Sequence, residues 1–199
     1  MLLVLCSCHV LAQEQPEFIN NMEKTPPRKF YVKTNAASWL LAISNLAIEA
    51  DLAQHWSFSL PVSYAAWNYF SSSIKFRTLS FYPEIRYWAS AENDGWFAGV
   101  HYGMAWYNFC IDKAYRTQDK GGHTPAIGGG ATVGYRLPLS KSNRWKMELS
   151  LGIGVYRLHQ DKFLNKPNGA WCRTERKCYF GPDQLSLSFA YMFDMKKRR

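Results

Sequence analysis

Apolar and polar side chains alternate strictly between Arg144 and Arg157. One parity of this stretch is apolar, namely Trp145, Met147, Leu149, Leu151, Ile153 and Val155. The other parity carries mostly small residues with two opposite charges, namely Lys146, Glu148, Ser150, Gly152, Gly154 and Tyr156. Successive side chains of an extended chain point to opposite sides, so the pattern predicts a β-strand with one apolar face.

The same alternation recurs along the chain and predicts eight strands in an up-and-down antiparallel order. The other seven are expected at about 29–41, 43–53, 56–67, 74–88, 96–109, 124–137 and 184–194. Pro83 falls inside the fourth of these and predicts a bulge, because proline cannot donate to a ladder. The segments 111–123 and 159–181 are expected to be long loops.

The composition of the two faces decides which of them points outward. The polar faces are too poor in charge for a solvated surface, and eight strands enclose an interior just wide enough for side chains to fill. We therefore predict an all-β, eight-stranded up-and-down transmembrane β-barrel of the bacterial outer membrane, with lipid outside and a small, charged lumen. A lipocalin-like barrel with its apolar face inward is the soluble alternative.

Tryptophans near the strand ends agree with this orientation, because amphipathic rings favour the headgroup level of a bilayer. Those beside short turns are Trp56, Trp88, Trp96 and Trp145, and those toward the other ends are Trp39, Trp67 and Trp106.

Composition adds the compartment. The 199 residues are 47% hydrophobic and contain no apolar run of about 18, so no helix of the mature chain is expected to span a bilayer. Residues 1–12 are apolar and end at Ala12, which predicts a secretory signal peptide; cleavage before a lipidated Cys8 is the alternative. Residues 13–28 are expected to form a polar linker, 29–195 the barrel and 196–199 a solvated basic tail. The tail supplies four of the positive charges behind the net charge of +9.

Charged residues of the inward parity are expected to gather in the lumen as Lys33, Glu49, Asp51, Glu84, Arg86, Arg136, Lys146 and Glu148. Four acids and four bases in a narrow interior should pair, because an unpaired buried charge is costly. A plug that closes the lumen is the favoured interpretation. A gated path for ions or protons, or catalysis by a Glu/Arg set, are the alternatives.

Other candidate chemistry is sparse. Cys172 and Cys178 flank a short basic segment, and either a disulfide or two unpaired thiols fits an exported chain. No metal site and no cofactor is expected, because no second Cys/His pair stands at ligand spacing. His101 faces inward as a filler or a general base, but no nucleophile is assigned to it.

Basic residues on the long-loop side favour outward contacts with anionic partners. They are Lys75, Arg77, Lys113, Arg116, Lys120, Lys162, Lys166, Arg173, Arg176 and Lys177. Charge-assisted contacts to the phosphates of lipopolysaccharide, or to another envelope or surface protein, compete with simple solvation of the loops. Nucleic-acid binding is not expected, because the bases are scattered over loops and the aromatics lie on strands. A monomer is expected.

Several motifs together resemble one known family: Lys33-Thr34-Asn35, Pro83-Glu84-Ile85-Arg86-Tyr87-Trp88, Tyr135-Arg136, Arg144-Trp145 and Tyr179-Phe180-Gly181-Pro182. Over residues 30–193 the chain resembles the Bacteroidota outer-membrane barrels grouped as domain of unknown function 3575. The resemblance implies a barrel of a family without an established activity, and it assigns no catalytic residues to this chain. The expected function is thus a small closed barrel with a structural or surface-interaction role and no enzymatic activity. The alternatives are a lipid-modifying barrel enzyme acting on lipopolysaccharide or phospholipid, and a narrow channel.

Overall fold

The computed structural model describes residues 29–68, 75–110, 114–166 and 168–194. The predicted signal peptide, linker and basic tail lie outside these residues. The elements are β1 (Lys29–Asn35), α2 (Ala36–Leu40), β2 (Ser44–Ala53), β3 (Trp56–Asn68), β4 (Lys75–Phe81), β5 (Glu84–Trp88), β6 (Gly95–Phe109), β7 (Tyr115–Asp119), β8 (Ala126–Pro138), β9 (Trp145–Leu164) and β10 (Trp171–Asp194).

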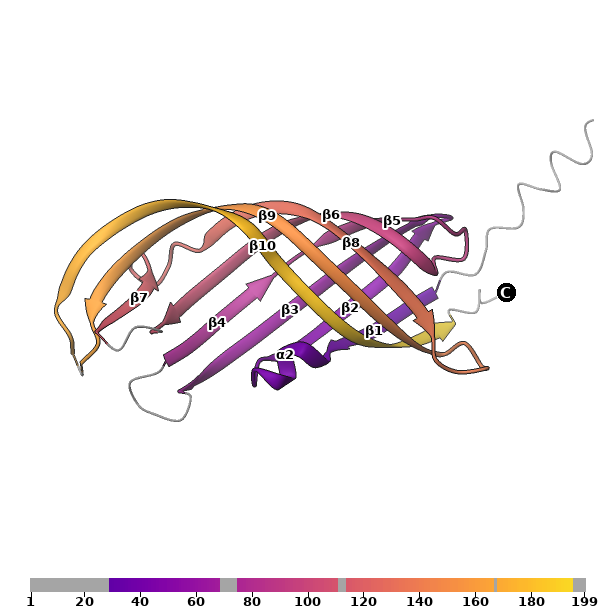
Figure 1. Ribbon diagram of the computed structural model, residues 1–199, viewed down its shortest axis with the longest axis horizontal. Helices are drawn as coiled ribbons and strands as arrows, with labels where there is room; N and C mark the ends of the chain where they lie inside the picture. Colours follow the sequence, from indigo (N-terminus) through magenta and orange to yellow (C-terminus); the bar gives the residue numbers. More distant parts are fainter. Residues whose placement is uncertain (1–28, 69–74, 111–113, 167, 195–199) are drawn as a thin grey trace, which may run out of the picture.

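Antiparallel pairing joins these strands into a ring of eight (Figure 1). The ring runs β1, β2, β3, β4 with β5, β6, β8, β9 and β10, and β10 closes it by pairing with both β9 and β1. β4 and β5 count as one strand, because both lie between β3 and β6. Both ends of the described chain meet at one end of the ring, where Lys29 pairs with Asp194. No helix among the described residues is long and apolar enough to span a membrane.

The predicted orientation of the side chains is confirmed. On β9, Leu149 is 57% exposed and Leu151 54%, whereas their neighbour Glu148 is 1% exposed. Arg86 on β5 is 3% exposed. The apolar side chains thus cover the outside of the ring, and the charged ones are enclosed by it.

The first predicted strand is wrong after Asn35, where α2 begins. The Asn35 side chain accepts a hydrogen bond from the amide of Ala37, which makes it the N-cap of this short helix. Apolar residues on successive positions, such as Trp39, Leu40 and Leu41, suited a strand equally well in the sequence. In the structure all three are exposed on the outside.

The predicted bulge at Pro83 is a full interruption between β4 and β5. The backbone polar groups nearby are satisfied across the gap, because the amide of Tyr82 donates to Pro61 and the carbonyl of Pro83 accepts from Tyr102. The missing N–H of proline breaks the ladder, and both neighbouring strands continue past it.

Two predicted loops are wrong in large part. Segment 111–123 contains β7, and segment 159–181 is mostly strand, because β9 extends to Leu164 and β10 begins at Trp171. The paired extensions of β9 and β10 form a curved hairpin beyond the ring, here called the arch (Figure 1). β7 pairs with the inner strand of the arch, Tyr115 lying opposite Leu164.

Candidate functional site

Six of the eight predicted lumen charges form one connected ionic network inside the ring. Five strands contribute to it, each from its inner face: Lys33 from β1, Glu49 from β2, Glu84 and Arg86 from β5, Arg136 from β8 and Glu148 from β9. Their side chains are at most 4% exposed. Residues distant in sequence are therefore joined in one buried cluster.

Two carboxylates hold the network together. Glu148 lies 2.7 Å from Arg86 Nη1, 2.7 Å from Arg136 Nη2 and 3.3 Å from Lys33 Nζ. Glu49 receives the same three cations, at 3.1 Å, 2.7 Å and 2.5 Å respectively. Each carboxylate thus accepts charge-assisted hydrogen bonds from three bases, which is the arrangement that makes buried charge tolerable.

Glu84 completes the balance. It lies 2.7 Å from Arg86 Nη2, and the absence of a side chain at Gly99 leaves room for its carboxylate. Three acids then face three bases, so the network has no net charge when all six are ionised. Such a cluster fills and neutralises the interior without offering a free charge for transport.

Aromatic rings close the network from both sides. The guanidinium carbon of Arg136 lies 4.5 Å from the ring centroid of Tyr31 and 4.2 Å from that of Trp88. Arg86 lies 4.4 Å from the centroid of Phe97. These cation–π contacts desolvate the planar faces of both arginines while the edges bind carboxylates.

The remaining two predicted charges lie outside this network. Lys146 pairs with Asp94 at 2.5 Å, and Asp94 was not predicted because it stands in the turn before β6. Asp51 is buried, and its Oδ1 has no hydrogen-bond partner among the described residues. Alternating parity located both side chains correctly in the lumen but carried no information on the turn residue that Lys146 binds.

A second polar cluster centres on Asp183, which lies between the predicted loop 159–181 and the predicted last strand 184–194. The register of β10 against β9 shifts between Pro182 and Gln184, and such a bulge re-aims the side chain it contains. Asp183 Oδ2 lies 2.6 Å from His101 Nε2 and 2.7 Å from the hydroxyl of Tyr156, which donates to it. No sequence pattern indicated Asp183 as the partner of His101, because the bulge breaks the alternation of inward and outward side chains along β10.

This cluster has the chemical order of a nucleophile, a base and an orienting acid. Thr132 Oγ1 lies 2.9 Å from His101 Nδ1, whose other nitrogen contacts Asp183. However, Thr132 is 3% and His101 6% exposed, and neither borders the two cavities beside Asp183. The hydrogen bonds of His101 to Thr132 and Asp183 tie β6, β8 and β10 together, which supports a packing role.

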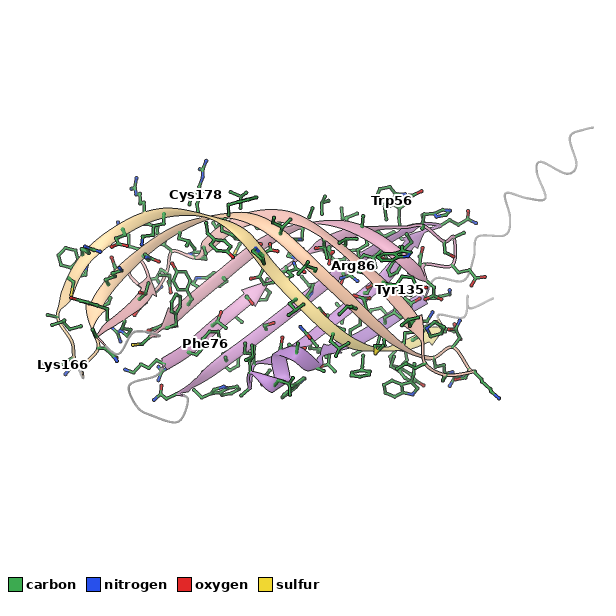
Figure 2. All side chains as sticks on the ribbon, viewed as in Figure 1. Trp56, Phe76, Arg86, Tyr135, Lys166 and Cys178 are labelled. Carbon is green, nitrogen blue, oxygen red and sulfur yellow. The ribbon has the colours of Figure 1, made fainter. Side chains whose placement is uncertain are left out.

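The arch is a basic surface beyond the ring. Lys162, Arg173 and Lys177 surround one acid, Glu175, at 3.4 Å, 2.5 Å and 3.0 Å. The hydrogen bond from Lys177, with those from the other neighbours, lowers the pKa of Glu175 to about 2. Three bases around one acid leave this face positively charged. Lys166 adds a base at the tip of the arch (Figure 2).

The predicted disulfide is not formed. Cys172 and Cys178 are both free thiols and both exposed. They lie six residues apart on the same strand, β10, which separates them by roughly 20 Å at about 3.3 Å per residue. A disulfide requires Cα atoms no more than about 7 Å apart. The structure thus agrees with the other alternative, two unpaired thiols. A disulfide was considered because the segment between the cysteines was expected to be a loop.

Within the described residues, no group of three or more His, Cys, Asp or Glu side chains is placed to hold a metal ion. No curated protein and no solved structure matches the chain. A family model described as "Protein of unknown function (DUF3575)" matches residues 1–193, nearly the whole sequence. The chain, with its eight-strand ring and buried ionic network, therefore belongs to the DUF3575 family.

Proposed function

We propose that this protein is a small, monomeric β-barrel of the bacterial outer membrane with a sealed lumen and a structural or surface-interaction role. The observation that carries the proposal is the inverted arrangement of side chains, apolar outside and ionised inside. Soluble proteins rarely expose continuous apolar patches of more than a few hundred Å². Here exposed large apolar residues lie on the outside of every strand of the ring except β1, which a lipid environment explains.

Exposed aromatic residues support the same placement. Trp56, Trp96 and Trp145 are 45%, 62% and 51% exposed near the end where the chain ends meet, and Trp39 is 53% exposed on α2 farther along. Figure 2 places Trp56 near the end opposite Lys166. Trp88, expected at the same level as Trp56, is instead 0% exposed and lies against Arg136 inside the ring. The exposed rings still lie at two levels, which the two headgroup regions of a bilayer favour.

The neutral network supports a closed lumen. Ions that entered the ring would meet three acids already bound to three bases, with aromatic rings on the guanidinium faces. We therefore expect no steady conductance and favour the scaffold over the channel.

The arch supports a role at the cell surface. Its bases project beyond the ring, on the side opposite the chain ends, where the phosphates of lipopolysaccharide or an acidic envelope protein would meet them.

Membrane fractionation followed by gel electrophoresis with and without boiling tests the placement. A folded barrel should pellet with outer membranes and change its migration on heating. A chain that stays in the soluble fraction would overturn the proposal. In planar bilayers the protein should give no current steps, and regular steps would instead support the channel.

Binding to lipopolysaccharide vesicles tests the surface role. Replacing Lys162, Arg173 and Lys177 together by Gln should weaken binding, whereas Lys141→Gln, an exposed change at the opposite end, should not. Equal binding by both variants would contradict a role for the arch. Lipid A masses should be the same with and without the protein, because the hydroxyl–imidazole–carboxylate chain is sealed; new lipid A species would favour the lipid-modifying enzyme.

A further inference from the structure

The wall of the ring has an opening beside β10, here called the seam. The last pair between β1 and β10 is Asn35 with Ser188, so residues 171–187 of β10 pair with β9 alone among the described strands. β2 begins only at Ser44, after α2. Beyond the level of α2, therefore, no described strand joins β10 to β2.

The edge of β10 at the seam is finished by side-chain contacts. The side-chain Nδ2 of Asn35 donates to the backbone carbonyl of Leu185 at 3.1 Å, and its Oδ1 accepts from the backbone amide of Leu187 at 3.1 Å. Pro182, farther along the same edge, has no N–H to leave unpaired. These are devices by which proteins stabilise an edge that takes no further strand. The opening is thus a built feature of the wall.

A cavity of about 340 Å³ leads from the seam into the ring. Its floor includes Lys33 and Arg86 of the ionic network, and its outer border includes Leu46 and Leu185, which are 55% and 67% exposed. This volume lies at the lower end of the range for sites that bind small molecules, about 300–1,000 Å³. Beside the mouth, the exposed Leu40 and Leu41 offer apolar surface at the same level.

The lining of the cavity selects the chemistry of its ligand. Most of its polar side chains carry a hydroxyl or an amide, which both donate and accept; examples are Asn45, Ser63, Thr78, Ser186 and Gln184. The Nε2 of Gln184 is buried without a hydrogen-bond partner among the described residues.

The formal charges that border the cavity cancel. Two bases, Lys33 and Arg86, are matched by two acids, Glu148 and Asp183. A charged head group would add an uncompensated charge to this interior, which is costly. A ligand rich in hydroxyls, each able to donate and accept, satisfies the lining at no such cost.

We infer that the seam admits a membrane amphiphile whose uncharged glycosyl head group binds in this cavity while its alkyl chain lies against the apolar mouth. The inference rests on the proposed membrane placement, because the mouth then faces lipid. The ionic network forms the floor, so the head group enters from the side and stops above it.

Native mass spectrometry of the protein in lauryldimethylamine oxide micelles tests this inference. The probes are n-dodecyl-β-D-maltoside and dodecylphosphocholine, which share a chain and differ in head group. The wild-type chain should retain one maltoside with a preference of about tenfold over phosphocholine. Equal retention of the two probes would mean unspecific detergent binding and would overturn the inference.

Variants separate the cavity from the outer surface. Ser63→Phe fills the cavity from β3 and should abolish the preference, whereas Ala66→Phe, on the lipid-facing parity of the same strand, should keep it. Gln184→Leu removes the unpartnered amide at nearly constant volume and should lower the preference several-fold even if Ser63→Phe fails to fold. Unchanged preference in Gln184→Leu would overturn the inference.

The gel shift on heating, measured on every sample, separates the two proposals. A wild-type chain without the shift would overturn the membrane placement itself. A chain that shifts but shows no preference for the glycoside would overturn only the site.

Discussion

Removing one carboxylate from the ionic network should destabilise the whole ring. In Glu148→Gln, Lys33, Arg86 and Arg136 face only Glu49 and Glu84, so one buried positive charge is left over. Breaking a buried ion pair by removing one partner costs about 3–5 kcal/mol. Because glutamine keeps one carbonyl acceptor for the arginines, we expect the free energy of unfolding to fall by about 3 kcal/mol, at the low end of that range.

A compensating change tests whether charge balance is the cause. Lys33→Met combined with Glu148→Gln leaves two bases and two acids, and should recover about 2 kcal/mol relative to Glu148→Gln alone. Urea unfolding of the vesicle-inserted protein, followed by tryptophan fluorescence and by the gel shift, measures both. Glu92→Gln, in an exposed turn, is the control and should stay within about 0.5 kcal/mol of wild type. A cost below about 1 kcal/mol for Glu148→Gln, or a double variant less stable than the single one, would refute charge balance as the cause.

Three further predictions concern the arch, the seam and the thiols. The lowered pKa of Glu175 means that its stabilising contribution is complete above its ordinary pKa of 4.5 and is lost as the pH falls toward about 2. Hydrogen exchange in the arch should therefore accelerate as the pH falls from 4.5 to about 2. The Glu175→Gln variant should not show this pH dependence. Asn35→Ala should lower the free energy of unfolding by about 1–3 kcal/mol and speed exchange of the Leu187 amide, whereas Asn68→Ala should do neither. Cys172 and Cys178 should both react with maleimide in the folded protein without reductant, and a single label would contradict the two free thiols.

The ring was predictable because each of its strands keeps one parity over most of the part that forms the ring. Side chains such as Leu149 and Glu148 differ only in the side of the strand they occupy, and that side follows from counting residues. The six members of the network were found in the same way. Their mutual pairing followed from the cost of isolated buried charge.

The arch, the seam and the Asp183 cluster escaped prediction for related physical reasons. Beyond the ring β10 is exposed on both faces, and β9 there buries the polar Gln160 and Asp161. The alternation of apolar and polar residues therefore fades, and the strands resemble a loop in sequence. The bulge between Pro182 and Gln184 shifts the parity of β10 and turns Asp183 inward, and counting residues along the sequence does not reveal such a shift. The seam was missed because the side chain of Asn35, in place of a strand, binds the edge of β10. Its partner Leu185 lies 150 positions away in the sequence.

The ionic network joins β1, near the start of the described chain, to β9, near its end. Glu49 and Glu148 each bind cations from β1, β5 and β8, so a sheet that lacks one of these strands leaves both carboxylates short of a partner. On the proposed membrane placement, we expect incomplete rings to be unstable in lipid, because their network charges lack partners until the first and last strands have met.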